Sequence, residues 1–367
     1  MSIATTHLDA IENNLRAVQQ RVGERLVLAP VKANAYGHGA VAVATMIQET
    51  GCADWLGVAL VSEGLELRAA GIQMPILKLS VERDDLKLAI EHGITLTVID
   101  KASALAAAGA AKAIGARANV HLKVDTGMRR IGVEPAQAAQ LAQFIVADEY
   151  LNLTGVFSHM PISDSPAGQS FSLRQIEQFA QVCDEVEAVA GPLIKHLANS
   201  GAVLGYPDAW FDMVRPGIMI YGSYPDPEAE RSVAIEPGLS WTSELSFVKQ
   251  IKAGETVGYG RTWTAAEDTY IGTVPVGYGD GYSRLLSNRG RVIIDGAYYP
   301  IVGRVCMDQF MVDLGPATTL QVGDGVTLIG SQGDAQITAS ELAETMQTIP
   351  YEVTCLITAR VERRQSS

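Results

Sequence analysis

The sequence predicts an α/β protein: a (β/α)8 barrel of the TIM type followed by a smaller, mainly antiparallel β domain. Up to about residue 235, short apolar runs alternate with amphipathic helical stretches. Eight such runs are present, which favours a barrel over an open sheet. After Tyr224–Glu228, an acidic stretch broken by prolines, the apolar runs are bounded by Gly, Asp and Asn. That second pattern is typical of antiparallel strands.

The expected barrel strands are continuous apolar runs, which is typical of parallel strands covered by helices on both faces. They span Leu26–Val31, Trp55–Leu60, Ile76–Leu79, Leu96–Ile99, Ala118–Val124, Leu153–Ser158, Ile194–Ala198 and Val214–Ile220. Helical periodicity between these runs predicts helices at Ser62–Ala70, Lys101–Ile114, Ala136–Ala147 and Phe171–Ala190.

The expected β domain has six strands and one helix. The strands span Leu245–Ile251, Tyr270–Val276, Arg291–Ile294, Ile301–Cys306, Phe310–Leu314 and Gly325–Ile329. The helix is expected at Thr338–Met346. We therefore divide the chain into a barrel domain, residues 1–235, and a β domain, residues 236–367.

Composition and charge exclude several classes of partner. The 367 residues are 47% hydrophobic and carry a formal net charge of -13, which argues against nucleic acid and against an anionic membrane surface. No uncharged apolar stretch reaches the roughly 20 residues of a membrane span. The first residues, Met1–Asp9, lack a basic segment followed by an apolar run, so we expect a cytoplasmic protein.

The cysteines and histidines show no metal-ligand pattern. The four cysteines lie far apart, without a C-x-x-C pair, and we expect reduced thiols. They are Cys52, Cys183, Cys306 and Cys355. The six histidines do not cluster with acids at metal-ligand spacing, so we expect no metal.

Polar residues follow the expected barrel strands at their carboxyl ends, where a parallel barrel gathers its functional groups. They are Lys32, Lys123, Asp125, Thr126, His159, Asn199 and Ser200, while Arg215, Gly217 and Ile218 lie in the eighth expected strand. Lys32 follows an apolar strand and should be partly buried. Burial disfavours an ammonium ion and makes the amine nucleophilic toward an aldehyde. A lysine at a strand end that extends to solvent is the alternative.

Nine short segments, in order along the chain, resemble those of fold-type III pyridoxal-phosphate enzymes, and most closely those of alanine racemases. They span Pro30–Gly39, Lys123–Gly132, Phe157–His159, His196–Gly201, Val214–Gly222, Gly258–Trp263, Gly277–Gly281, Gly303–Gln309 and Pro350–Glu352. The sequence departs from the family pattern at three places. These are Arg129 beside Arg130, Met160-Pro161 after His159, and the loosely matching tail Thr358–Arg364.

The resemblance implies pyridoxal 5'-phosphate as cofactor, anchored by Lys32. Hydroxyl and amide donors would hold its phosphate, with glycine allowing close approach of the backbone. These cofactor-binding residues would be Tyr36, Asn199, Ser200, Gly217, Ile218 and Tyr351, together with His159. Arg215 would face the pyridine nitrogen. An arginine stays charged and disfavours protonation of its neighbour, which suits return of a proton over transamination.

The resemblance also implies a two-base reaction that interconverts L-alanine and D-alanine and supplies D-alanine for peptidoglycan. Lys32 would act on one face of the substrate and Tyr259 on the other. A tyrosine, with an ordinary pKa of about 10, needs tuning. His159, with Arg215 behind it, would provide it. In the family Tyr259 reaches the site from the partner subunit, which implies a homodimer with shared active sites.

The remaining assignments concern the substrate. The resemblance implies that Arg130 contacts the cofactor's phenolic oxygen or the substrate carboxylate, and that the Met307 backbone amide binds that carboxylate. Tyr278 would narrow the entrance or contact the substrate, and Asp308 would support Arg130 or Tyr259. Lys123 would be carbamylated, as in some members, or would form an ordinary ion pair.

Two other functions remain open. A fold-type III amino-acid decarboxylase has the same architecture, but it would carry a glycine-rich phosphate loop that we do not find. A non-enzymatic carrier of pyridoxal phosphate would consist of the barrel alone. The β domain, with its own candidate catalytic residue Tyr259, argues against a carrier.

Overall fold

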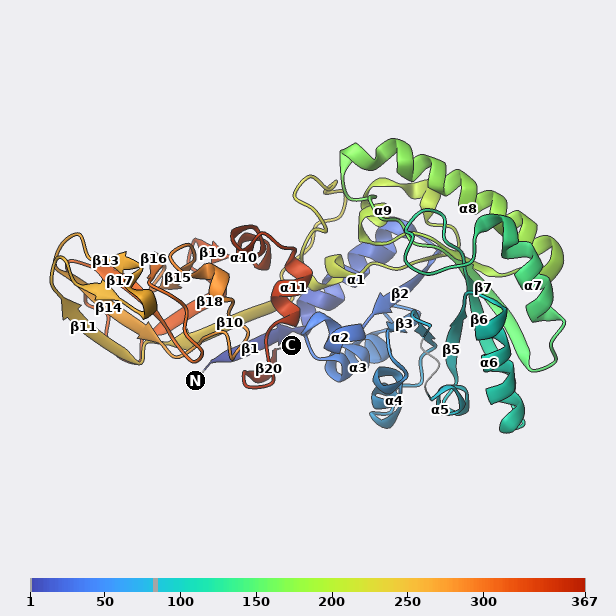
Figure 1. The fold of residues 1–367 in the computed structure, drawn as a ribbon, viewed down its shortest axis with the longest axis horizontal. Coiled ribbons are helices and arrows are strands. Elements are labelled where there is room, and N and C mark those ends of the chain that lie inside the picture. The colour runs from blue at the N-terminus through green and yellow to red at the C-terminus, as the bar shows by residue number, and fades with distance from the viewer. Residues whose placement is uncertain (1, 82–84, 367) are drawn as a thin grey trace.

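The structure is a computed structural model that describes residues 2–81 and 85–366. It is elongated, with a barrel at one end and a β domain at the other (Figure 1). The barrel holds eight parallel strands in the order β8-β7-β6-β5-β4-β3-β2-β9. Backbone hydrogen bonds join the outer strands: the Asp212 amide donates to Lys195 O (3.0 Å) and the Arg215 amide to Ala198 O (2.9 Å). The predicted barrel is confirmed.

The barrel strands alternate with helices that cover their outer face (Figure 1). The strands are β2 (Leu26–Pro30), β3 (Trp55–Val58), β4 (Ile76–Lys78), β5 (Ile94–Val98), β6 (Ala118–Lys123), β7 (Leu151–Phe157), β8 (Ile194–His196) and β9 (Met213–Val214). The α-helices are α1 (Leu8–Val22), α2 (Lys32–Tyr36), α3 (Ala40–Thr50), α4 (Val61–Ala69), α5 (Leu86–Glu91), α6 (Lys101–Ala113), α7 (Ala138–Val146), α8 (Gln169–Ala190) and α9 (Ser200–Gly205). Short 3-10 turns η1 (Pro135–Gln137), η2 (Pro166–Gly168), η3 (Pro207–Ala209) and η4 (Ile218–Tyr221) complete it.

The prediction of a strand at Val214–Ile220 is wrong. Strand β9 ends at Val214, and Ile218–Tyr221 forms the 3-10 turn η4. Pro216 has no amide hydrogen to donate to a neighbouring strand and restricts the residue before it. The apolar residues after it are buried all the same, so burial without strand pairing produced the misleading pattern.

The β domain is built on one sheet in the order β11-β14-β17-β16-β15-β18-β10-β1-β20, with β19 paired to β18. Its later strands are β10 (Leu239–Glu244), β11 (Phe247–Ile251), β14 (Thr269–Val274), β15 (Arg291–Ile294), β16 (Ala297–Val302), β17 (Phe310–Gly315), β18 (Gly325–Gln332), β19 (Ala335–Ile337) and β20 (Glu362–Ser366). A separate hairpin pairs β12 (Thr256–Val257) with β13 (Trp263–Thr264), around the turn η5 (Tyr259–Arg261). Helices α10 (Ala339–Met346) and α11 (Pro350–Cys355), and the turn η6 (Arg284–Leu286), lie outside the sheet. Nearly all its strand pairs are antiparallel, which confirms the predicted fold class.

The prediction of a strand at Ile301–Cys306 is wrong over its second half. Strand β16 ends at Val302, because Gly303 adopts φ +75° and turns the chain. A Cβ at Gly303 would lie 2.7 Å from the Val257 carbonyl oxygen. The turn therefore packs the segment that contains Cys306 and Met307 beside the β12–β13 hairpin.

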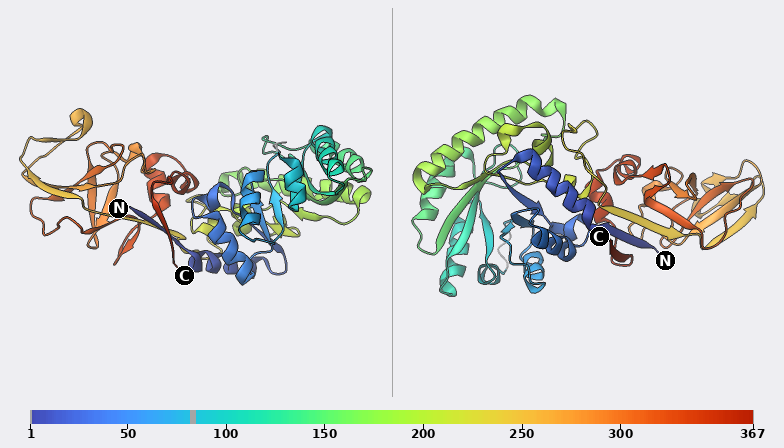
Figure 2. Two further views of the ribbon diagram at one scale, coloured as in Figure 1. Left: turned by 90° about the horizontal axis from the view of Figure 1, so that it is seen from below. Right: turned by 180° about the vertical axis from the view of Figure 1, so that it is seen from behind.

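The first strand of the chain lies in the sheet of the β domain. Strand β1 (Ile3–His7) pairs antiparallel with β10 and parallel with β20. The C-terminal end lies near the junction of barrel and β domain, and the N-terminal end lies beside the β domain (Figure 2). The division of the chain at residues 235 and 236 stays a prediction, and its outermost residues, 1 and 367, lie outside the described residues.

Each unit has its own hydrophobic core. The barrel core gathers residues from the strands and inner helix faces, and the β domain core includes the ring stack of Trp241, Tyr282 and Phe310. In the described part of the chain, no helix has both the length and the apolarity to cross a membrane. The same residues contain no group of three or more His, Cys, Asp or Glu side chains placed to bind a metal ion.

Candidate active site

A left-handed turn of the backbone presents Lys32 at the barrel rim. Lys32 follows strand β2, and the next four residues, Ala33–Tyr36, have φ between +51° and +53°. Gly37 continues the turn at φ +84°. The Asn34 side chain stabilises it by accepting a hydrogen bond from the Ala40 amide (2.8 Å). Lys32 and Tyr36 therefore stand at the two ends of one tight turn.

The Tyr36 hydroxyl, Ser200 and Gly217 form a polar cradle. The Gly217 amide donates to Ser200 Oγ (2.8 Å). A Cβ at Gly217 would lie 3.0 Å from the Tyr36 hydroxyl oxygen and 3.8 Å from Ser200 Oγ. Within the described residues no group accepts or donates a hydrogen bond at the Tyr36 hydroxyl. Glycine thus keeps a small space open between two hydroxyl groups, and the buried Ile218 follows directly at the start of η4.

Helix α11 of the β domain adds Tyr351 to this cradle. Its ring lies 5.8 Å from the Tyr36 ring, centroid to centroid. On the other side, the Tyr36 ring stacks on Tyr221 at 5.0 Å. Burial raises the pKa of both Tyr36 and Tyr351, so their hydroxyls stay protonated and can donate hydrogen bonds.

Asn199 is occupied by contacts within the rim. Its Oδ1 accepts hydrogen bonds from Ser163 Oγ (2.6 Å) and from the Ala202 amide (3.2 Å), and its Nδ2 donates to Met160 O (2.9 Å). It therefore caps helix α9, to which Ser200 belongs, and fixes the loop after His159.

Arg215 is buried and donates to several acceptors from strands β7 and β8. Its Nη2 donates to Ser158 O (2.6 Å) and Leu197 O (3.1 Å). Its Nη1 lies 2.8 Å from His196 Nδ1, and its Nη2 lies 3.5 Å from His159 Nδ1. Burial lowers the pKa of Arg215 to about 9, so it keeps its charge at neutral pH.

Positive charges act on each other at this rim, where Lys123 and Arg215 are buried. Burial lowers the pKa of Lys32, and the charges of Arg130 and Arg215 lower it further. Burial, helped by the same two arginines, lowers the pKa of Lys123 to about 7. Burial and Arg215 hold the pKa of His159 well below its ordinary value. At neutral pH His159 is therefore neutral, and Lys123 is only partly charged.

The two adjacent arginines point to different partners. Arg129, at φ +56°, forms an ion pair with Glu134 at 2.6 Å. Arg130 is the one whose charge acts on Lys32, Lys123 and His159. Asp125 shapes the loop between them by accepting from the Gly127 and Arg129 amides at 2.9 and 3.0 Å.

Unlike Tyr351, the other residues predicted from the β domain are exposed; they are Tyr259, Tyr278, Met307 and Asp308. The β12–β13 hairpin, which carries Tyr259, lies at the end of the β domain remote from the barrel (Figure 1). Tyr259 is 74% exposed and Met307 53%. The exposed Tyr278 is fixed next to Met307, since its amide donates to Cys306 O (3.0 Å). Asp308 forms an ion pair with Arg360 at 2.8 Å.

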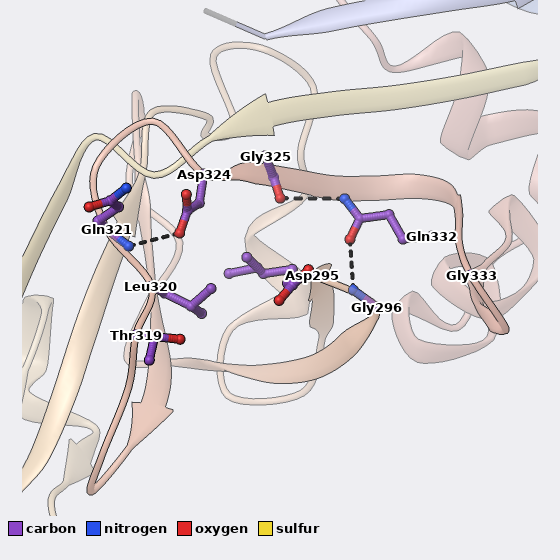
Figure 3. A pocket seen from close by; sticks show the side chains of 10 residues that line it. Asp295, Gly296, Thr319, Leu320, Gln321, Asp324, Gly325, Gln332 and Gly333 are labelled. Carbon is purple, nitrogen blue, oxygen red and sulfur yellow. Dashed lines mark hydrogen bonds between the residues drawn. The ribbon is translucent and has the colours of Figure 1, made fainter.

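A polar hollow of about 740 Å³ lies elsewhere in the β domain, between the turns at Asp295–Gly296 and Gln332–Gly333 and the loop 319–325 (Figure 3). Its polar groups bond to one another: the Gly296 amide donates to Gln332 Oε1 (3.2 Å), and Gln332 Nε2 donates to Gly325 O (3.4 Å). No predicted site residue is among the described residues that line it. The candidate site is therefore the barrel rim.

Comparison with known proteins identifies the family. The family described as the alanine racemase N-terminal domain matches residues 6–225, and the alanine racemase C-terminal domain matches residues 238–365. The chain belongs to the alanine racemase family. An alanine racemase of Cutibacterium acnes is 50% identical over 99% of this chain and 97% of its own length. One from Symbiobacterium thermophilum is 42% identical over 98% of this chain and 96% of its own length.

A solved structure agrees. The alanine racemase of the D-cycloserine-producing Streptomyces lavendulae superimposes with a TM-score of 0.95 at 36% identity, covering 100% of this chain and 97% of that one. The family depends on pyridoxal phosphate. The residues present here fit that group. A partly buried amine with a lowered pKa suits its aldehyde, and the hydroxyls beside Gly217, with the space that a Cβ would fill, suit its phosphate.

Several residues of the rim were not predicted as functional. His196 lies in the family-like segment His196–Gly201, but the resemblance assigns no function to it, although it contacts Arg215. His121 extends that contact, with Nδ1 2.9 Å from His196 Nε2. Glu63 accepts a hydrogen bond from the Ala33 amide. The contacts of these three residues join positions 19 to 75 apart in the sequence, so no local pattern predicts them. The one available signal was that His121 and His196 lie in barrel strands.

Proposed function

We propose that this protein catalyses the pyridoxal-phosphate-dependent interconversion of L-alanine and D-alanine. The observation that carries the proposal is the Lys32 amine. It is partly buried, has a lowered pKa, and stands one turn from a hydroxyl cradle at the rim of a barrel that belongs to the alanine racemase family.

Pyridoxal phosphate, when bound, links covalently to amines and withdraws electrons from the Cα–H bond of an amino acid. We propose that Lys32 anchors it. The phosphate is assigned to Tyr36, Ser200, Tyr351 and the amides at Gly217 and Ile218. Asn199 supports them by capping α9. Arg215 is assigned to the pyridine nitrogen, where its retained charge disfavours protonation of the ring.

Racemisation requires removal of the Cα proton on one face and its return on the other. We assign Lys32 to one face and Tyr259 of the partner subunit to the other. His159 is neutral and accepts from Arg215 at Nδ1, so its Nε2–H is available to the tyrosine oxygen. A hydrogen bond donated to that oxygen stabilises its charged form, so more of the tyrosine is present as the phenolate that can accept the proton.

The substrate carboxylate is assigned to Arg130 and to the Met307 backbone amide. Of the adjacent Arg129 and Arg130, Arg130 is the one whose charge acts on Lys32, in agreement with this role. Tyr278, beside Met307, would narrow the entrance. In a single chain Asp308 pairs with Arg360, so its support for Arg130 or Tyr259 would act through that ion pair or across the dimer.

We also propose a cytoplasmic homodimer that supplies D-alanine for peptidoglycan. The exposure of Tyr259 and Met307 supports the dimer, and the bacterial origin of the relatives supports the role. Growth of a bacterium that requires external D-alanine, after introduction of this chain, tests the role.

The Lys32→Ala variant tests the function. We expect it to lose covalent capture of pyridoxal phosphate, trapped with borohydride, and to lose at least about a thousandfold in kcat for alanine racemisation. A panel of L- and D-amino acids identifies the preferred substrate. The matched control is Lys112→Ala on the outer helix α6, which should behave like the wild type.

Two results would contradict this function. One is trapping and racemisation by Lys32→Ala at the wild-type level. The other is release of carbon dioxide from a basic amino acid by the wild type, which would indicate a decarboxylase.

A further inference from the structure

Glu63 lies directly beneath the turn that carries Lys32. It belongs to the first turn of helix α4, and its Oε1 accepts a hydrogen bond from the Ala33 amide at 2.7 Å. Its Oε2 accepts from the Ala59 amide (2.7 Å) and the Leu60 amide (3.0 Å). One carboxylate thus joins the residue after Lys32 to the loop between β3 and α4.

The turn needs such a contact. Four consecutive L-residues with φ near +50° lie in a region that side chains disfavour, so the conformation persists only where its surroundings hold it. At its far end, Gly37 packs against the Thr354 carbonyl of α11, and Arg363 donates to the Gly37 carbonyl. Glu63 is the side chain that holds its near end, next to the amine.

The charge of Glu63 also matters. The groups that act on Lys32 are Glu63, Arg130, Arg215 and Cys355, and Lys123 and His159 share the same rim. Burial and the two arginines disfavour the ammonium form. Glu63 is the carboxylate among them, and it favours the ammonium form and raises the pKa of Lys32.

We propose that Glu63 is a positioning residue for Lys32: it fixes the start of the left-handed turn and supplies the negative charge that faces the amine. The inference rests on the proposed function, in which Lys32 binds the cofactor and then moves a proton. A base whose pKa falls too far holds a proton poorly, and a base on a loosened turn reaches the substrate less often.

The Glu63→Gln variant removes the negative charge. It also removes the hydrogen bonds from backbone amides to one of the two side-chain oxygens, since the amide nitrogen that replaces this oxygen cannot accept them. We expect kcat for alanine to fall by roughly ten- to a hundredfold with KM nearly unchanged, because Arg130 and Met307 are untouched. Glu66→Gln, on the next turn of the same helix, is the control with the same change of charge and should match the wild type.

A second measurement does not depend on the substrate. Full-length protein freed of cofactor is given pyridoxal phosphate at a series of pH values, and borohydride traps the product. The neutral amine forms a C–N bond with the aldehyde carbon and water leaves, so the capture rate follows the neutral fraction of Lys32. We expect the midpoint to move to lower pH in Glu63→Gln, and to stay in place in Glu66→Gln.

The Glu63→Asp variant separates charge from reach. It keeps the carboxylate but is one methylene too short to span both loops, so we expect a reduced kcat with a midpoint closer to the wild type. Two results would overturn the inference. One is a folded Glu63→Gln variant with an unchanged kcat and an unchanged midpoint in the pH dependence of cofactor capture. The other is an equal shift of that midpoint in the Asp and Gln variants. Wild-type protein that captures the cofactor but does not racemise alanine would instead refute the proposed function.

Discussion

At the scale of the residue, Arg215 sets the protonation of the imidazoles around it. A guanidinium only donates, so His196 Nδ1 must accept and its proton must lie on Nε2. That proton is donated to His121 Nδ1, which leaves the single N–H proton of His121 on Nε2. His121 Nε2 has no hydrogen-bond partner among the described residues. Burial lowers the pKa of His121 to about 3, so the chain of imidazoles stays neutral while Arg215 carries the charge.

Lys123 gives a prediction at this scale. Its pKa of about 7 means that the neutral amine rises from about one tenth at pH 6 to about nine tenths at pH 8. Only a neutral amine adds carbon dioxide, with loss of a proton, to give a carbamate. We expect ¹³C-labelled bicarbonate to give a carbamate resonance that grows over this range. The anion would lie among Lys32, Arg130 and Arg215, which favour it.

The Lys123→Arg variant is the control, because it keeps the positive charge and cannot form the carbamate. From the sequence alone, an ordinary ion pair of Lys123 is the alternative to carbamylation. Among the described residues no carboxylate forms such an ion pair with Lys123. A wild-type spectrum identical to that of Lys123→Arg at pH 8 would contradict carbamylation.

Residue patterns predicted part of this site and missed the rest for a physical reason. Lys32, His159 and Arg215 each follow an apolar strand, and the ends of parallel strands meet at one rim, so their proximity could be predicted. Glu63 sits in the first turn of a helix, where an acid is ordinary because it favours the helix dipole. Its bond to Ala33 depends on a left-handed turn that the residues Ala33–Ala35 do not indicate.

At the scale of the element, that turn is held by its packing against α11. A Cβ at Gly37 would lie 2.2 Å from the Thr354 carbonyl oxygen, and Gly37 already requires φ +84°. The contact places Tyr351, three residues before Thr354 on α11, against the Tyr36 ring. The turn and α11 therefore form one unit, and the cradle exists only where they meet.

Gly37→Ala tests this unit. We expect it to lower the free energy of unfolding by about 3 kcal/mol or more, because strain adds to a clash with backbone that cannot rotate away. Gly51→Ala, at φ +64° with open space around it, is the matched control and should cost about 1 kcal/mol. Urea unfolding measures both. Equal losses in the two variants would show that α11 does not constrain the turn.

The errors in predicted elements have related causes. Val214–Ile220 is apolar and buried, but Pro216 ends the ladder, so hydrophobicity predicted burial correctly and pairing wrongly. Strand β1 was not predicted, because its five residues, Ile3–His7, mix apolar and polar side chains. Its partners, β10 and β20, lie more than 230 residues away, beyond the reach of any local pattern.

At the scale of the whole molecule, the chain ends bind the two units together. The chain starts in the β sheet, builds the barrel, and returns through β10 to pair with its own first strand. His7 contacts Ser240 and Ser366 at 3.0 and 2.8 Å, which joins β1, β10 and β20 by side chains as well. Arg363, near the end of the chain, donates to the Gly37 carbonyl in the turn after Lys32, so the β domain contacts the barrel rim of its own chain.

In the proposed reaction one chain does not complete that site, and this leads to the last prediction. Tyr259 lies on a hairpin at the far end of the β domain, and we propose that a second copy brings it to Lys32. We expect Lys32→Ala and Tyr259→Phe proteins, each inactive alone, to recover activity when mixed and reassembled. Each heterodimer pairs one intact lysine with one intact tyrosine.

The expected recovery follows from the symmetry of a dimer. Random exchange makes half the dimers mixed, with one intact site of two, so activity should reach about a quarter of the wild-type value. The exposed Tyr259 and Met307 supply the surface for this contact, and burying an aromatic ring there stabilises it. Mass analysis identifies the heterodimers. If confirmed heterodimers remain inactive, each site must draw both bases from one chain, and the hairpin would have to cross to its own barrel.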